Sequence, residues 1–109
     1  MALVELTADN FDAFVAENER VVVEFGAQWC APCRDFQRVL LALQSEYGDF
    51  SFAAIDIDRE AELAKEFDVR SVPSILIIKH GVIVYAGTGA LSAQVFRELL
   101  DQARVTESG

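Results

Sequence analysis

Cationic side chains are scarce in this sequence of 109 residues. It has nine Lys and Arg against eighteen Asp and Glu, which gives a formal net charge of −9. A surface of this sign repels the phosphate backbone of nucleic acids and the headgroups of anionic lipids. We therefore expect neither nucleic acid nor a membrane surface as a partner.

Long hydrophobic runs are also missing. Runs such as residues 75–78 are too short to cross a bilayer, and the first residues lack the basic start and apolar stretch of a signal peptide. The sequence therefore predicts a cytoplasmic protein in reducing surroundings.

Only two cysteines are present, Cys30 and Cys33, three positions apart. With 52% hydrophobic residues the chain can bury a core without a covalent staple, and a bridge closing so short a loop constrains the unfolded chain little. The pair therefore indicates a chemical role for the two thiols rather than a structural one.

Because no linker interrupts the sequence, we expect a single domain over residues 1–109, with a loose tail at 105–109.

Hydrophobic periodicity alternates between the helical and the strand pattern. Helices are predicted from a cap at Thr7 or Asp9 to about Asn18, over residues 32–47, after a cap at Asp58 and after a cap at Ser92. Buried strands are predicted over residues 21–25, 52–57, 75–78 and 82–86. Between the last two, His80 and Gly81 form a two-residue turn that makes these strands antiparallel.

This alternation predicts an α/β fold with right-handed parallel crossovers. We expect a three-layer α/β/α sandwich with four helices and a mixed sheet of about five strands, ending in an antiparallel hairpin.

The two thiols lie where a buried strand ends and a helix begins. Unpaired N–H groups and the helix dipole stabilise a thiolate at Cys30 by about 0.3 to 2 kcal/mol, which lowers the pKa of this thiol. Cys33 lies one turn deeper, where burial raises a thiol pKa. Cys30 is therefore expected to attack and Cys33 to resolve. Pro32 stiffens the loop, and Trp29 offers an apolar wall to a substrate.

Three segments together resemble the thioredoxin family in identity, order and spacing. They are Trp29-Cys30-Ala31-Pro32-Cys33, then Val72-Pro73 before a strand, then Gly89-Ala90-Leu91-Ser92 before the last helix. The resemblance covers residues 2 to 104 and implies the thioredoxin fold. It also implies reduction of protein disulfides through a redox-active Cys30–Cys33 disulfide, with no bound cofactor.

The resemblance also implies roles for the other matching residues. Val72-Pro73 would be a cis peptide facing the dithiol, and the backbone of Val72 would pair with an extended substrate. Ala31, Thr88, Gly89 and Ala90 would line the same groove. The expected partners are disulfide-containing proteins and an NADPH-dependent thioredoxin reductase, and the chain is expected to be a monomer.

Several positions depart from the family pattern. Glu24 stands where thioredoxins usually carry a buried Asp that accepts the proton of the resolving cysteine, and Ala54 replaces a Lys that often pairs with it. Gly26 replaces a Trp. Because Glu24 would be buried without a cation, we expect its pKa to be raised. The dithiol loop contains no His, which favours a reductant over an oxidant.

Other interpretations of these residues remain open. The cysteines could be an inert pair or half a zinc site, Glu24 a solvated acid, Pro73 a strand start and Trp29 a core-edge aromatic. The acids at 56, 58, 60 and 62 are more typical of a helix start than of a metal site, so no metal is assigned. The alternative function is a redox-inactive or partner-specific binding or chaperone module that uses the groove around Trp29 and Pro73.

Overall fold

A single mixed sheet forms the centre of the molecule in the computed structural model, which describes residues 3–106. Its strand order is β1-β3-β2-β4-β5. The strands are β1 (Val4–Glu5), β2 (Arg20–Gly26), β3 (Ser51–Asp56), β4 (Ser74–Lys79) and β5 (Val82–Thr88). β1 and β2 run parallel to β3, whereas β4 is antiparallel to both β2 and β5.

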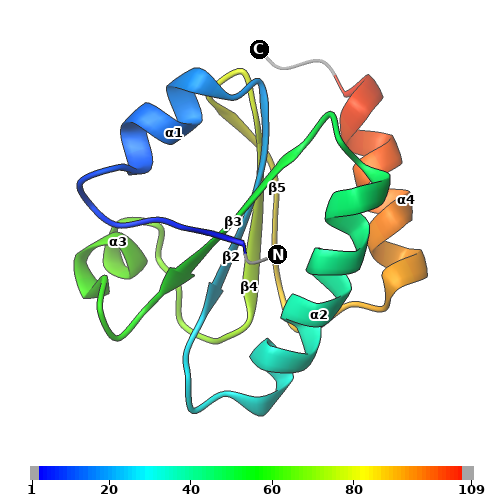
Figure 1. Cartoon of the computed structure of the whole chain (residues 1–109). Coiled ribbons are helices and arrows are strands. Elements are labelled where there is room, and N and C mark those ends of the chain that lie inside the picture. The colour runs from blue at the N-terminus through cyan, green and yellow to red at the C-terminus, as the bar shows by residue number, and fades with distance from the viewer. Residues whose placement is uncertain (1–2, 107–109) are drawn as a thin grey trace.

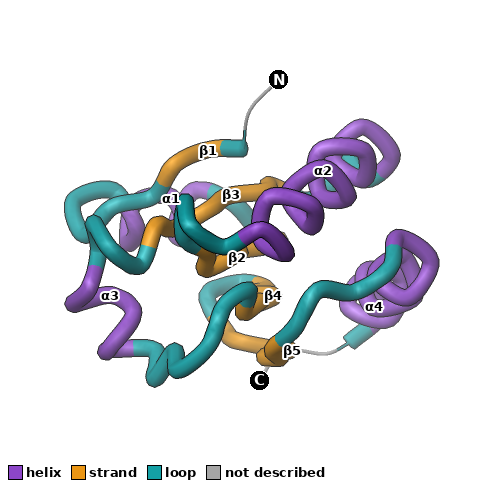
Figure 2. Tube along the Cα trace, turned by 90° about the horizontal axis from the view of Figure 1, so that it is seen from below, coloured by secondary structure: helices purple, strands orange, loops and turns teal. Residues whose placement is uncertain are grey.

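Helices cover both faces of this sheet (Figure 1). They are α1 (Phe11–Glu17), α2 (Ala31–Glu46), α3 (Ala61–Glu66) and α4 (Ala93–Val105). α1 and α3 lie on one face and α2 and α4 on the other, an arrangement that is also visible from below in Figure 2. The predicted three-layer α/β/α sandwich is therefore confirmed.

β2 supplies both hydrophobic cores because successive side chains of a strand point to opposite faces. Val21, Val23 and Phe25 pack in the core beneath α1 and α3. Val22 points the other way and packs with residues of α2 and α4. Glu24 lies on the same face of β2 as Val22. Its carboxyl group is therefore buried between the sheet and α2.

The antiparallel hairpin is confirmed. β4 pairs with β5 through the turn at His80 and Gly81, whose φ angles are +52° and +77°. Two consecutive residues in the left-handed region match the right-handed twist of the strands, and Gly81 adopts this conformation without steric cost.

Two predicted helix caps are wrong and one is confirmed. α1 begins only at Phe11, because the backbone carbonyl of Thr7 accepts bonds from Asn10 N and Phe11 N in a turn. Neither Thr7 nor Asp9 is its N-cap. α3 begins at Ala61, three residues after Asp58. The Asp58 carboxylate accepts a hydrogen bond from the side chain of Trp29 instead of capping the helix.

The cap of α4 is Ser92, as predicted, and its hydroxyl accepts a bond of 3.2 Å from Val95 N. Val105 was expected to open the loose tail, but it is the last residue of α4. Residues 107–109 of that tail lie outside the described residues. β1 was not predicted as a separate strand.

Candidate active site

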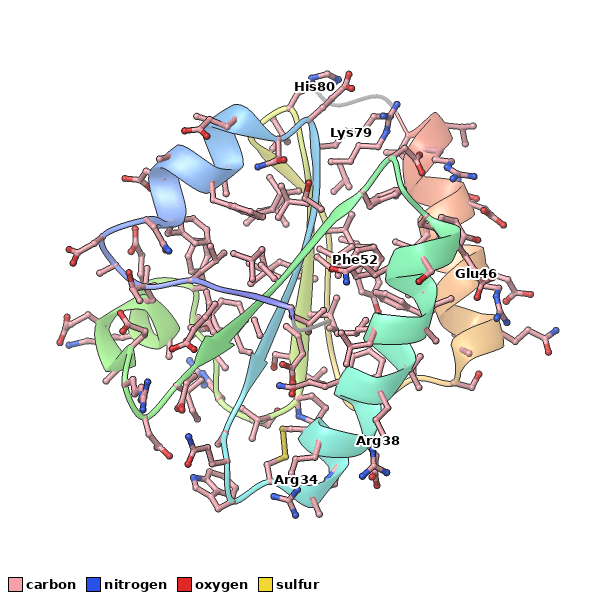
Figure 3. The ribbon with its side chains drawn as sticks, viewed as in Figure 1. Arg34, Arg38, Glu46, Phe52, Lys79 and His80 are labelled. Atoms are coloured by element: carbon pink, nitrogen blue, oxygen red, sulfur yellow. A yellow bond between two sulfur atoms is a disulfide. The ribbon has the colours of Figure 1, made fainter. Side chains whose placement is uncertain are left out.

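The two cysteines form a disulfide at the N-terminal end of α2, where β2 has just ended (Figure 3). Their Cα atoms are 5.2 Å apart. Cys30 is the N-cap of the helix, and its Sγ accepts a bond of 3.1 Å from Cys33 N. The Cys30 sulfur therefore accepts a hydrogen bond from one of the free backbone N–H groups at the start of α2. A thiolate at the same position would accept the same bond.

Exposure differs between the two cysteines. Cys30 is 5% exposed, whereas Cys33 is 0% exposed and packs on the inner face of α2. Pro32 lies in the first helical turn, where its missing N–H costs no hydrogen bond. Cys30 is therefore the more accessible of the two cysteines.

The Val72–Pro73 peptide bond is cis, which confirms the expectation that the resemblance raised. Val72 packs against the small cluster formed by Ala27, Cys30 and Cys33. The loop that precedes β4 therefore lies directly against the disulfide.

The segment after β5 is tied to the same loop. Gly89 N donates a bond of 2.8 Å to the carbonyl of Pro73, and Thr88 pairs with Ser74. Gly89 has φ +92°, a conformation that favours glycine. Thr88, Gly89 and Ala90 are exposed, as is Ala31 at the start of α2. Binding of substrate by these residues stays a prediction.

Trp29 stands out from the surface beside the disulfide. Its side chain is 67% exposed, so it is not an ordinary core-edge aromatic. Its Nε1 donates a bond of 2.9 Å to Asp58 Oδ2. Asp58 therefore orients the indole. The sequence had predicted this residue as a helix cap instead.

Glu24 is completely buried, which contradicts the view of it as a solvated acid. Burial raises its pKa from 4.5 to about 7, and a hydrogen bond from Gln37 offsets part of that rise. Its neighbour on β3 is Ala54, as expected, so that position offers no cation to the carboxylate. The predicted rise in the Glu24 pKa, and its cause, are confirmed.

Gln37 is the residue of this site that sequence reasoning missed. Its Nε2 lies 3.1 Å from Glu24 Oε1 and donates to it. The signal was available, because Gln37 follows Cys33 by four positions and so lies on the helix face that otherwise carries Phe36 and Leu40. A half-buried polar side chain next to those apolar residues is placed to bond a buried polar group.

The acidic segment after β3 has structural contacts of its own. Asp56 Oδ1 accepts from Asp58 N at 2.9 Å, and Glu60 Oε1 accepts from Ala8 N at 2.9 Å. Within residues 3–106, no group of three or more His, Cys, Asp or Glu side chains could hold a metal ion. The same range contains no helix long and apolar enough to cross a membrane.

A disulfide at the N-terminus of α2, beside the loop before β4 in this α/β/α sandwich, is typical of thioredoxin-fold disulfide oxidoreductases. Comparisons with known proteins agree with this class. The sequence model of the Thioredoxin family matches residues 2–102. A Streptomyces coelicolor protein, provisionally named thioredoxin 2, is 38% identical over 101 residues, which are 93% of this chain and 75% of the relative.

Thioredoxin from Bacillus subtilis is 34% identical over 103 residues, which cover 94% of this chain and 98% of that protein. Among solved structures, Fasciola hepatica thioredoxin has a TM-score of 0.85 at 33% identity, over 92% of this chain and 98% of that one. A mutant thioredoxin from Halobacterium salinarum has a TM-score of 0.88 at 25% identity, over 98% of this chain and 95% of that one.

The chain belongs to the thioredoxin family. It is a thiol-disulfide oxidoreductase, whose redox-active group is the Cys30–Cys33 disulfide.

Proposed function

We propose that the protein works as a reductant of disulfides in other proteins, with Cys30 as the nucleophile and Cys33 as the resolving thiol. The observation that carries this proposal is the asymmetry of the pair: Cys30 caps α2 and keeps 5% of its surface exposed, whereas Cys33 is fully buried. A thiolate is stabilised at a helix N-terminus, and attack requires access to the substrate sulfur.

The reaction proceeds in two exchanges. The Cys30 thiolate attacks one sulfur of the substrate disulfide, and the other substrate sulfur leaves as a thiolate that takes up a proton. Cys33 loses its proton and attacks Sγ of Cys30, which releases the second substrate sulfur as a thiolate that also takes up a proton. Two electrons pass to the substrate, which becomes a dithiol, and Cys30–Cys33 becomes a disulfide.

Glu24 is the acceptor of the Cys33 proton in this proposal. It is buried on the same side of the sheet as α2, the helix that carries Cys33. A pKa of about 7 suits the task, because a general base works best when its pKa lies near the operating pH.

The substrate segment binds in the groove around the disulfide. Trp29 forms one wall, and Val72 with the cis Pro73 forms the other, where the backbone of Val72 pairs with an extended chain. Ala31, Thr88, Gly89 and Ala90 complete the surface. The close packing of Val72 on the cysteines and the bond from Gly89 to Pro73 support this assignment.

Electrons are supplied by an NADPH-dependent thioredoxin reductase, and the protein acts as a monomer in the cytoplasm. The membership of the thioredoxin family supports a reductase as donor. The Ala31-Pro32 pair between the cysteines supports the reducing direction, because it contains no His that would stabilise the Cys30 thiolate further.

The second candidate function is a redox-inactive or partner-specific module that holds other proteins in the groove. The 67% exposure of Trp29 favours it, since exposed aromatic side chains are typical of protein-binding surfaces.

Reduction of insulin disulfides separates these functions. NADPH oxidation is followed with a thioredoxin reductase for the wild type and for Cys30→Ser, and dithiothreitol replaces the reductase in a parallel series. Turnover by the wild type alone is the expected result. Turnover with dithiothreitol only would assign a different electron donor. Equal rates for both proteins in both series would refute reduction and favour the binding module.

A further inference from the structure

The carboxyl group of Glu24 occupies the space in which residue 26 would carry its side chain. A Cβ atom built on Gly26 would lie 2.6 Å from Glu24 Oε2 and 3.1 Å from Oε1. Real Cβ atoms essentially never approach another atom to less than 3.0 Å. The two residues lie on the same face of β2, because they are two positions apart.

The two oxygens of this carboxyl group have different surroundings. Oε1 accepts the bond from Gln37, whereas Oε2 is buried and has no hydrogen-bond partner among residues 3–106. Buried polar atoms are normally paired, and of these two oxygens only Oε1 has a partner among these residues. The carboxyl group is thus held by one hydrogen bond and by its contact with a glycine.

Open space adjoins this position. A pocket of about 430 Å³ is lined by Gly26, Ala54 and Gln37, and it reaches the exposed side chains of Glu5 and Arg59 at the surface. A carboxyl group pushed off Gly26 would find room in this solvent-connected pocket rather than deeper in the core.

We infer that Gly26 and Gln37 are positioning residues for Glu24: the absence of a side chain at residue 26 admits the longer acid, and Gln37 fixes its orientation. The length of the acid at residue 24 and the size of residue 26 are therefore coupled. Glutamate keeps its present orientation only with glycine there, whereas aspartate, shorter by one C–C bond of about 1.5 Å, stops short of the added Cβ. The role of Glu24 as proton acceptor is the one proposed above, and the experiment below measures the carboxyl group without any turnover.

The Glu24 carboxyl pKa is measured by NMR in oxidised protein labelled at the carboxyl carbons of Glu and Asp, so that no thiol titrates. Gly26→Ala is compared with the wild type, and Gly48→Ala serves as the matched control, because an added Cβ at Gly48 meets nothing within 4 Å. Gln37→Leu removes the hydrogen bond. Glu24→Asp is measured with and without Gly26→Ala.

The two positioning residues are expected to move the pKa in opposite directions. Gly26→Ala lowers the Glu24 pKa by about one unit or more, because solvent contact relieves desolvation, the larger of the two effects on this group. Gln37→Leu raises it, because the bond from Gln37 favours the charged form. Gly48→Ala leaves it unchanged.

In Glu24→Asp, the pKa of the introduced aspartate is expected to be the same with and without Gly26→Ala. An unchanged or raised Glu24 pKa in Gly26→Ala, or an equal shift in the wild-type and Glu24→Asp backgrounds, would overturn the inference. Should Gly26→Ala not fold, the Gln37→Leu measurement decides in its place: a rise in the Glu24 pKa supports the positioning role, and no change overturns it.

Discussion

Replacing Glu24 by Gln removes a charge that the fold buries at a cost. The Glu24 pKa rises from 4.5 to about 7 on folding. At about 1.36 kcal/mol per pKa unit, the ionised carboxylate lowers the free energy of unfolding by about 3 kcal/mol at high pH. Between pH 4.5 and 7 the folded protein binds more protons than the unfolded chain, so the stability of the wild type falls as the pH rises.

Glu24→Gln lacks this titration and keeps an oxygen that can accept from Gln37. The amide of the introduced Gln also places an unpaired N–H group where Oε2 lies. This unpaired donor lowers the free energy of unfolding by an amount that does not depend on pH. The measured quantity is therefore the change with pH in the stability difference between variant and wild type. This difference is expected to move by about 3 kcal/mol in favour of the variant between about pH 4 and pH 8.

Urea denaturation of the oxidised proteins provides the assay, since the intact disulfide keeps both thiols from titrating. Glu98→Gln is the control, because it removes one negative charge from an exposed position on α4. A difference for Glu24→Gln that stays flat over this pH range, or that matches the profile of Glu98→Gln, would refute the account of Glu24 as a buried acid with a raised pKa.

Two further predictions concern the ends of α4. Lys79 Nζ donates hydrogen bonds to the backbone carbonyls of Ala103, Arg104 and Thr106, at 3.2, 2.8 and 2.8 Å. Lys79 lies at the end of the molecule opposite the disulfide (Figure 3). Lys79→Met is expected to lower the unfolding free energy by about 2 kcal/mol in urea, because bonds to a charged group are lost, and a loss below about 0.5 kcal/mol would contradict this. Ser92→Ala removes the bond to Val95 N and is expected to cost about 1 kcal/mol by thermal unfolding, whereas an unchanged Tm would show that the cap contributes nothing.

Features that repeat along the chain were predictable from the sequence. β2 is a run of buried residues and α2 shows helical spacing, so the strand–dithiol–helix unit could be placed to within a residue or two. The hairpin was equally clear because a turn with Gly81 separates two apolar runs.

Features that depend on distant contacts were not predictable. β1 has only two residues, both exposed, so it has no pattern, and it exists because it pairs with β3. Asp58 looked like a helix cap from its neighbours, yet its carboxylate bonds Trp29, 29 positions away. The contact of the Glu24 carboxyl group with Gly26 depends on the rotamer of a side chain, which no local pattern encodes.

Trapping the mixed disulfide tests the central assignment most directly. Reduced Cys33→Ser and Cys30→Ser proteins are each mixed with insulin, and the adducts are located by mass spectrometry of the digested protein. We expect a stable insulin adduct at Cys30 in Cys33→Ser, because the resolving thiol is absent, and none in Cys30→Ser, where Cys33 is buried. An adduct at Cys33 in Cys30→Ser, with none at Cys30 in the other variant, would contradict the assignment of Cys30 as the nucleophile.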